Sequence, residues 1–287
     1  MIDAKGIIGR GDFVPKRNLG QCFLTDKGIA ERIVNAIEIT PGDHVIEVGP
    51  GVCALTCLLC DRAGAVTAVE IDRRLIGIID AAMSGYDNLK LLNADILKIQ
   101  AGSLLSDNGA PPPGRVFMVS NMPYYISTPI MTRLFEEFSF IDRAVLMMQS
   151  EVAGKLLAAP SSDNYCMLTA FAKSFGTLKK LFTVPPHFFS PQPGVESTVM
   201  LLGAQSPPFF ENAADKAWYF RVVRAVFARR RKTIANSLMF AGLAQNRSQA
   251  EEAASLAGVP CGARGESLGA GELLALSRAV SSLTEIS

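Results

Sequence analysis

Short apolar runs alternate with segments of helical periodicity over the first two thirds of the chain. Near the start, apolar side chains recur at Ile29, Ile33 and Ile37, the spacing of one helix face, and Thr25 or Asp26 can cap this helix. The later apolar runs have the length of buried strands and lie at 44–48, 66–70, 89–92, 116–119 and 144–148. Because several of these runs are bracketed by helical segments, the pattern predicts a mostly parallel sheet covered by helices on both faces.

The pattern changes after residue 177. Two further strand-like runs, 177–184 and 197–202, are joined by a proline-rich link so short that we expect the two strands to be antiparallel. Residues 203–215 carry a Pro-Pro pair and have the composition of a linker, and helical patterns fill the rest. The sequence therefore predicts an N-terminal arm, an α/β domain and a small all-helical domain, at 1–24, 25–205 and 206–287.

Length and composition limit the classes of protein to which the chain can belong. The chain has 287 residues, a net charge of +1 and six scattered cysteines. Its length allows one large core and a smaller one. It contains no apolar stretch as long as a membrane helix, and its first 24 residues lack the apolar middle of a secretory signal. We therefore expect a reduced, cytoplasmic protein without a membrane partner.

The near-neutral total hides a basic region. Residues 216–250 contain eight Lys or Arg and no Asp or Glu, and four of the cations are consecutive at 229–232. A local basic patch on a neutral protein favours contact with a polyanion, although a solvated helix face paired with acids elsewhere is the alternative. We expect a basic helix from Trp218 to Leu238 to contact RNA phosphates, and the candidate contacts are Arg221, Arg224, Arg229, Arg230, Arg231 and Lys232.

A glycine turn follows the run at 44–48. Gly49 and Gly51 let the backbone approach a ligand, and the helix start that follows offers free N–H donors. Glu70 ends the next strand, at the distance at which a carboxylate binds the two hydroxyls of a ribose. NAD and S-adenosylmethionine both contain such a ribose, so this turn alone leaves the cofactor open.

Asp95 helps to separate the two cofactors. It follows a third strand, where a carboxylate can accept the amine of an adenine ring. A nicotinamide oxidoreductase would also need a proton relay, and neither of the two histidines is obviously suited to it. The alternative interpretation is that Glu70 and Asp95 are both ordinary helix caps. The joint pattern favours a methyl donor in one crevice at the carboxyl ends of the strands.

The sequence Asn-Met-Pro-Tyr at 121–124 supplies what methylation of an exocyclic amine requires. The lone pair of an adenine amine is delocalised into the ring. The side-chain oxygen of Asn121 and the carbonyl of Met122 or Pro123 can accept its two N–H bonds and redirect that lone pair. The ring of Tyr124 can stack on a base taken out of its own stack. Four residues are short for a motif, so this interpretation depends on the upstream pattern.

Cys53, Cys57 and Cys60 have the spacing of radical enzymes that hold an iron–sulfur cluster. We expect them on the helix after the glycine turn, where the first and last would lie about 10 Å apart along the axis. A compact cluster cannot be held from such a stripe, and cysteine packs well as a small buried side chain. We therefore expect no metal site.

These motifs together resemble the bacterial small-subunit ribosomal RNA adenine dimethyltransferases, whose loss confers kasugamycin resistance. The resemblance covers nearly the whole chain. It includes residues 16–24, 47–51, Glu70, Asp95, 121–124, 185–197 and the Arg-Arg-Arg-Lys-Thr-Ile run at 229–234. It implies a Rossmann-like class I methyltransferase domain followed by a small helical domain.

The resemblance also implies site residues. Cofactor contacts fall at Cys22, Leu24, Gly49, Gly51, Glu70, Asp95 and Asn121. Phe189, in the proline-rich link, would sandwich the target base with Tyr124, so the catalytic set is Asn121, Pro123, Tyr124 and Phe189. Two departures concern the cofactor side: Cys22 stands where the family usually has Asn, and Cys53 replaces a helix-start glycine. With Cys22 in place of Asn, we expect the polar contact to the carboxylate end of the cofactor to be weaker or to be made by the backbone.

The implied function is dimethylation of the N6 amines of two adjacent adenosines near the 3′ end of 16S rRNA. S-adenosylmethionine would be the donor, an immature small subunit the partner and a monomer the active form. Two alternatives remain: a large-subunit rRNA dimethylase of the macrolide-resistance type, and a non-catalytic ribosome assembly factor with the same fold. The basic helical tail argues against the first, and intact Asn121 and Tyr124 argue against the second.

Overall fold

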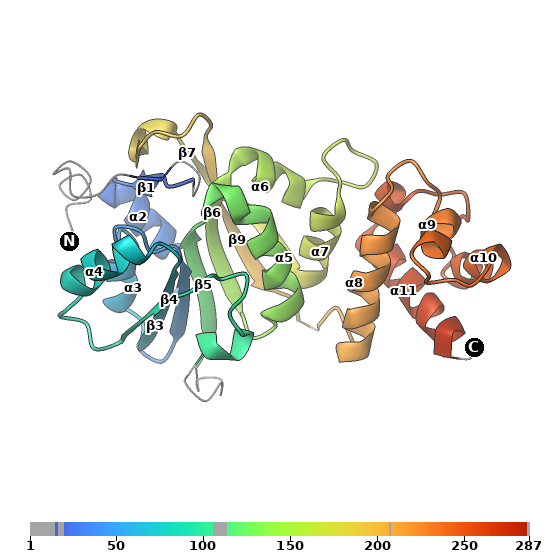
Figure 1. Cartoon of the computed structure of the whole chain (residues 1–287), viewed down its shortest axis with the longest axis horizontal. Coiled ribbons are helices and arrows are strands. Elements are labelled where there is room, and N and C mark those ends of the chain that lie inside the picture. The colour runs from blue at the N-terminus through green and yellow to red at the C-terminus, as the bar shows by residue number, and fades with distance from the viewer. Residues whose placement is uncertain (1–14, 17–19, 106–113, 207, 286–287) are drawn as a thin grey trace. The chain divides into compact units, whose positions relative to one another are not determined.

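The computed structural model describes residues 15–16, 20–105, 114–206 and 208–285 (Figure 1). Contacts divide the chain into two compact units, Met1–Ala153 with Thr177–Ala204, and Gly154–Gly176 with Gln205–Ser287. The proposed N-terminal arm at 1–24 lies largely outside the described residues. No helix among the described residues is both long enough and apolar enough to cross a membrane.

The first unit is built on a seven-stranded sheet with the order β4-β3-β2-β5-β6-β9-β7. The five expected parallel strands are present, and β9 pairs antiparallel with β6. Thr177, at the start of β7, hydrogen-bonds Gly203, at the end of β9, so these two strands run in opposite directions, as predicted. The strands are β2 (His44–Val48), β3 (Ala65–Glu70), β4 (Leu89–Asn93), β5 (Val116–Asn121), β6 (Arg143–Gln149), β7 (Gly176–Val184) and β9 (Ser197–Ala204).

Helices connect the parallel strands and bury one stripe each. In α2 the side chain of Asp26 accepts the N–H of Ile29, so Asp26 is the N-cap, and Ile29 and Ile33 are buried as the periodicity predicts. This stripe packs with α3 and α4 against alternate side chains of the strands, such as Val45 and Phe117. The helices of this unit are α2 (Lys27–Val34), α3 (Thr56–Cys60), α4 (Arg73–Ala82), α5 (Ser127–Glu137) and the start of α6 (Ser150–Leu157).

The strand order has a switch point. From β2 the chain moves outward to β3 and β4, then returns to the other side of β2 to form β5 and β6. The loops after β2 and β5 therefore leave the sheet in opposite directions and open a crevice between them. The register brings the end of β2 level with the end of β5, and Ser120 donates a hydrogen bond to the carbonyl of Val48 at 2.6 Å.

The second unit is helical. Two buried tyrosines tie it together: the hydroxyl of Tyr165 donates to the carbonyl of Leu268, and that of Tyr219 donates to the carbonyl of Ala170. By contacts this unit includes residues 154–176, which the sequence pattern placed in the first domain. Its helices are α7 (Met167–Phe175), α8 (Ala213–Phe227), α9 (Ile234–Phe240), α10 (Arg247–Leu256) and α11 (Ala270–Glu285).

Candidate active site

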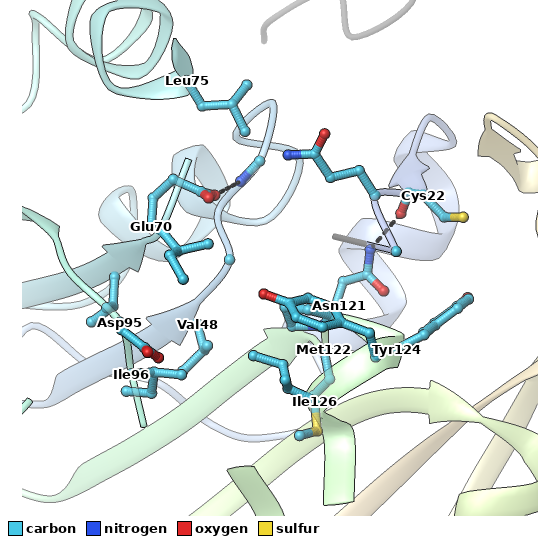
Figure 2. Close-up of a pocket in the computed structure, with 18 of the residues that line it drawn as sticks. Cys22, Val48, Glu70, Leu75, Asp95, Ile96, Asn121, Met122, Tyr124 and Ile126 are labelled. Atoms are coloured by element: carbon cyan, nitrogen blue, oxygen red, sulfur yellow. Dashed lines mark hydrogen bonds between the residues drawn. The ribbon is translucent and has the colours of Figure 1, made fainter. Parts of the chain in front are cut away.

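A cavity of about 640 Å³, open solvent at its mouth included, lies at the carboxyl ends of the parallel strands of the first unit. Figure 2 shows Glu70 and Asp95 on one side of this cavity and Asn121 and Tyr124 on the other. The structure thus brings together side chains from β3, the β4 end and β5. Of the predicted site residues, Cys22, Gly49, Gly51, Glu70, Asp95, Asn121, Pro123 and Tyr124 line it.

The glycine turn and the proline turn meet at Gly49. The φ angle of Gly49 is +71°, in the left-handed region, and a Cβ built there would lie 3.3 Å from the ring of Pro123. A larger residue would be strained and would push the two loops apart. The close approach therefore keeps the glycine side and the proline side of the cavity at a fixed separation.

Glu70 is held by main-chain donors. Its carboxylate accepts the N–H of Asp72 at 2.8 Å and the N–H of Gly51 at 3.4 Å. Burial raises the pKa of Glu70, and these two N–H donors oppose that shift. Glu70 is not a helix cap, because Asp72 caps α4. The carboxylate thus lies in the cavity wall with its orientation fixed, as a ribose-binding group requires.

The two carboxylate oxygens of Asp95 have different partners. One accepts the N–H of Leu97 at 2.9 Å, and the other lies 3.8 Å from the ammonium of Lys98. Asp95 therefore stabilises its own turn, which is part of the capping alternative, and also lines the cavity on the same side as Glu70. The Lys98 contact is almost fully exposed and weak, so it leaves the second oxygen available to a ligand amine.

The two polar atoms of the Asn121 side chain differ in their hydrogen bonding. Its amide nitrogen donates to the carbonyl of Cys22 at 3.1 Å, drawn as a dashed line in Figure 2. Its side-chain oxygen is buried and has no hydrogen-bond partner. An unpartnered buried oxygen is costly to the folded protein unless a ligand donor reaches it. The arrangement fits an acceptor reserved for an N–H group.

The main-chain acceptor beside it is Met122 rather than Pro123. The carbonyl of Pro123 already accepts from the Ile126 N–H at 3.2 Å and from the Ser127 hydroxyl at 3.0 Å. No such partner occurs for the Met122 carbonyl among the described residues. The sequence left these two carbonyls as equal alternatives, and the local helix start at 124–126 decides between them.

Tyr124 is half-buried with its ring orientation fixed. Its hydroxyl forms a short hydrogen bond with Ser197 at the start of β9, and burial raises its pKa to about 12. The phenol therefore stays protonated at neutral pH and contributes its ring face rather than a charge.

Phe189 does not take the position predicted for it. Its side chain is 3% exposed, belongs to the hydrophobic core and does not line the cavity. Its backbone pairs with Leu24 in a small antiparallel sheet of β1 (Phe23–Leu24) and β8 (Phe189–Ser190). The ring therefore packs in the core, beside the β1–β8 pairing, and its stacking on a target base stays a prediction. Leu24 likewise is buried, beside an adjoining cavity.

Glu47 is a site residue that the sequence analysis did not single out. It lines a second cavity of about 270 Å³, which shares Gly49, Gly51 and Asn121 with the first. One of its carboxyl oxygens is buried without a partner, and burial raises its pKa to about 8. Glu47 and Asn121 thus line adjoining cavities, and each has one buried side-chain oxygen without a partner. The signal in the sequence that could have identified Glu47 is an acidic residue inside an otherwise apolar strand.

Three of the cysteines lie in or beside the turn after β2. Cys53 lies before α3 with φ +61°, so the expectation that it shares a helix with Cys57 and Cys60 is wrong. A residue with a side chain at this angle is strained, which accounts for the family's usual glycine. Burial raises the pKa of both Cys53 and Cys60. Among the described residues no cluster of three His, Cys, Asp or Glu side chains has metal-binding geometry.

The basic residues lie in the second unit, and four of them are not helical. Helix α8 ends at Phe227 and α9 begins at Ile234, so 229–232 form the turn between them; a continuous basic helix was expected and is not present. Several cations are already engaged. Arg221 stacks on Trp218, Arg224 lies over Phe171, Arg229 lies over Phe240 and Arg230 pairs with Glu266. All six predicted cations are exposed.

The first unit therefore combines a carboxylate held by main-chain donors (Glu70), a second carboxylate (Asp95) and an unpartnered amide oxygen (Asn121) on residues that line one cavity with Tyr124. The free main-chain carbonyl lies next to that oxygen. This arrangement can hold a nucleoside cofactor on the glycine side and an N–H donor on the proline side.

Comparisons with known proteins agree with this chemistry. The chain is 39% identical to the "Ribosomal RNA small subunit methyltransferase A" of Bacillus pumilus, covering 96% of this chain and 94% of the relative. It is 40% identical to the protein of that name from Moorella thermoacetica, with 92% of each covered. A solved dimethyladenosine transferase from Plasmodium falciparum superimposes with a TM-score of 0.69 at 26% identity, covering 88% and 95%.

A second solved structure, the 23S rRNA methyltransferase ErmE, superimposes with a TM-score of 0.62 at 30% identity, covering 90% of this chain and 99% of that one. The model of one protein family, "Ribosomal RNA adenine dimethylase", matches residues 13–259. The chain therefore belongs to the ribosomal RNA adenine dimethylase family of S-adenosylmethionine-dependent methyltransferases.

Proposed function

We propose that the protein dimethylates the N6 amines of two adjacent adenosines near the 3′ end of 16S rRNA. Its substrate is the rRNA within an immature small subunit, its active form is a monomer and it acts in the cytoplasm. The observation that carries the proposal is the buried, unpartnered side-chain oxygen of Asn121, a residue that lines the same cavity as Glu70 and Asp95.

Cofactor positioning follows from the cavity wall. Glu70 accepts from the ribose hydroxyls, and Asp95 accepts from the adenine amine with the oxygen that Leu97 does not use. S-adenosylmethionine supplies a methyl group on a sulfonium, which is already an excellent leaving group. Positioning and alignment therefore provide most of the catalysis.

Amine activation follows from the proline turn. The oxygen of Asn121 and the carbonyl of Met122 accept the two N–H bonds of the target adenine and aim its lone pair at the methyl. Tyr124 packs against the base that has left its stack. The methylated amine is acidic, so its proton can leave to water without a strong general base. After the first transfer one N–H remains, and the second round proceeds with one acceptor unpaired.

The choice of ribosomal subunit rests on the relatives. Those named for the small subunit match at 39–40% identity, whereas the large-subunit enzyme ErmE matches at 30%. The proposal is tested with purified protein, labelled S-adenosylmethionine and either undermethylated small subunits or large subunits. We expect two labelled dimethyladenosines per small subunit and none in the large subunit. Label confined to the large subunit would select the macrolide-resistance alternative, and no label in either would select the non-catalytic one.

The basic turn at 229–232 is expected to contact phosphate. Neutralising Arg229, Arg231 and Lys232 to Gln leaves the Arg230–Glu266 pair intact. Because each phosphate contact releases counterions, we expect the slope of log affinity against log salt to flatten by roughly two units. RNA affinity at low salt should fall about tenfold or more, measured by filter binding across a salt series.

The matched control replaces Lys27, Lys179 and Lys180 with Gln, three exposed cations of the first unit. It changes the net charge by the same amount. Equal slopes for the two triple variants would show that total charge, rather than this turn, governs RNA affinity.

A further inference from the structure

Residues 20–22, here called the cover segment, line the cofactor cavity from outside the sheet. On one side, the side-chain nitrogen of Gln21 donates to the carboxylate of Asp72 at 3.0 Å. On the other side, the carbonyl of Cys22 accepts from Asn121 at 3.1 Å. The segment thus reaches from the start of α4 to the end of β5, the two walls between which the cofactor binds.

The segment also packs closely on the proline turn. Gly20 has φ +57°, and a Cβ built on it would lie 3.4 Å from the backbone nitrogen of Tyr125 and 3.6 Å from that of Tyr124. Gly20 therefore lies against the backbone of Tyr124 and Tyr125 and against the Tyr125 ring, whose Cδ1 would be 3.5 Å from such a Cβ. Any outward movement of the cover segment separates it from Tyr124, Tyr125 and Asn121 together.

Asp72 is built as a fixed anchor. Its side chain is only 2% exposed. Arg74 donates to both of its oxygens, from Nε at 3.0 Å and from Nη2 at 2.6 Å, and the ammonium of Lys16 lies 4.0 Å away. The guanidinium of Arg74, with a smaller contribution from the Gln21 hydrogen bond, holds the pKa of Asp72 well below its ordinary value, so it is ionised throughout the physiological range. A hydrogen bond to an ionised acceptor is stronger than one between neutral groups.

Gln21 uses both ends of its amide. Its oxygen accepts the backbone N–H of Lys16 at 2.7 Å, while its nitrogen holds Asp72. Loss of Gln21 leaves Asp72 satisfied by Arg74, so the anchor and the α4 cap do not depend on it. The pairing joins positions 51 residues apart, and its loss frees only the cover segment.

We propose that the Gln21–Asp72 hydrogen bond fastens the cover segment over the bound cofactor and sets the rate at which the cofactor leaves. Gln21 and Asp72 are positioning residues: they act through the segment that closes the cavity. This inference rests on the assignment of S-adenosylmethionine as cofactor.

The test measures dissociation of S-adenosylhomocysteine by stopped-flow and affinity by calorimetry, without RNA. We expect Gln21→Leu to raise the dissociation rate and the Kd about tenfold, the loss of one charge-assisted hydrogen bond. The melting temperature without ligand should stay within about 1 °C, since the segment contributes little to the core. Gln100→Leu, an exposed glutamine of the same unit, is the matched control and should not change either quantity.

A polarity swap makes the test independent of simple loss of packing. Gln21→Glu places a second carboxylate against Asp72 and should raise the dissociation rate more than Gln21→Leu. Adding Asp72→Asn restores a hydrogen bond with donor and acceptor exchanged, and Asn still caps a helix. We expect the double variant to return to within about threefold of the wild type.

A double variant no better than Gln21→Glu, or a Gln21→Leu dissociation rate within twofold of the wild type, would overturn the inference. If Gln21→Leu does not fold, the comparison of Gln21→Glu with the double variant Gln21→Glu, Asp72→Asn tests the inference by itself. Failure of the wild type to bind S-adenosylhomocysteine or S-adenosylmethionine would instead contradict the cofactor assignment.

Discussion

Asn121→Ala is expected to lower the rate of methyl transfer by about 10²- to 10³-fold, the cost of removing one preorganised hydrogen-bonding group from a reacting centre. The side-chain oxygen of Asn121 is the acceptor that the fold leaves unpartnered in the cavity. Without it, the lone pair of the target amine stays conjugated with the ring. Single-turnover transfer of labelled methyl to undermethylated small subunits measures the effect.

RNA affinity of this variant should stay within about twofold of the wild type, since phosphate contacts dominate such affinities. Asn121→Asp separates the two ends of the side chain. It keeps an acceptor but loses the donor to Cys22, so we expect an intermediate rate. Asn164→Ala, at an exposed position, is the matched control. A rate for Asn121→Ala within threefold of the control would contradict the amine-orienting role.

Glu70→Ala is expected to weaken cofactor binding by about 100-fold or more, since two charge-assisted hydrogen bonds at about 1.5 kcal/mol or more each are lost. The carboxylate is fixed by the N–H groups of Gly51 and Asp72, so its direction toward the ribose costs nothing at the moment of binding. Calorimetry with S-adenosylhomocysteine measures the change. Asp80→Ala, on the exposed face of α4, is the control.

A ligand change tests the same contact from the other side. The 2′-deoxy form of S-adenosylhomocysteine should bind the wild type much more weakly than the parent compound does. In Glu70→Ala the two ligands should bind alike, because the partner of the missing hydroxyl is already gone. If the variant still discriminates between them as the wild type does, another group holds the ribose.

Much of the fold and part of the site could be predicted because they depend on local pattern. The strands at 44–48, 66–70 and 116–119 are short buried runs, and such runs reveal themselves by their apolar continuity. Glu70 and Asn121 are the last residues of their strands, and Asp95 lies two residues after the end of β4. In a parallel sheet the carboxyl ends of the strands share one edge, so their convergence on one cavity followed from their order in the chain.

The expectations that differ from the structure concern a contact with a distant segment of the chain and the point at which a helix ends. Phe189 was placed on the base from its motif, but pairing of β8 with β1 buries its ring. The cations at 229–232 were placed on a helix from their neighbours' periodicity, but the chain breaks the helix after Phe227. Neither antiparallel pairing at a distance nor a helix break without proline or glycine has a local signature.

The sequence by itself determined the parallel α/β core, the order of the cofactor and amine groups along it and the family. Each of these is encoded by side-chain type at fixed spacing within a few residues. Only the tertiary structure decided which end of the Asn121 amide is without a partner, which neighbouring main-chain carbonyl is already engaged, and that Gln21 reaches Asp72. Those features are contacts between segments far apart in the chain, and they depend on distances that exist only once the core has packed.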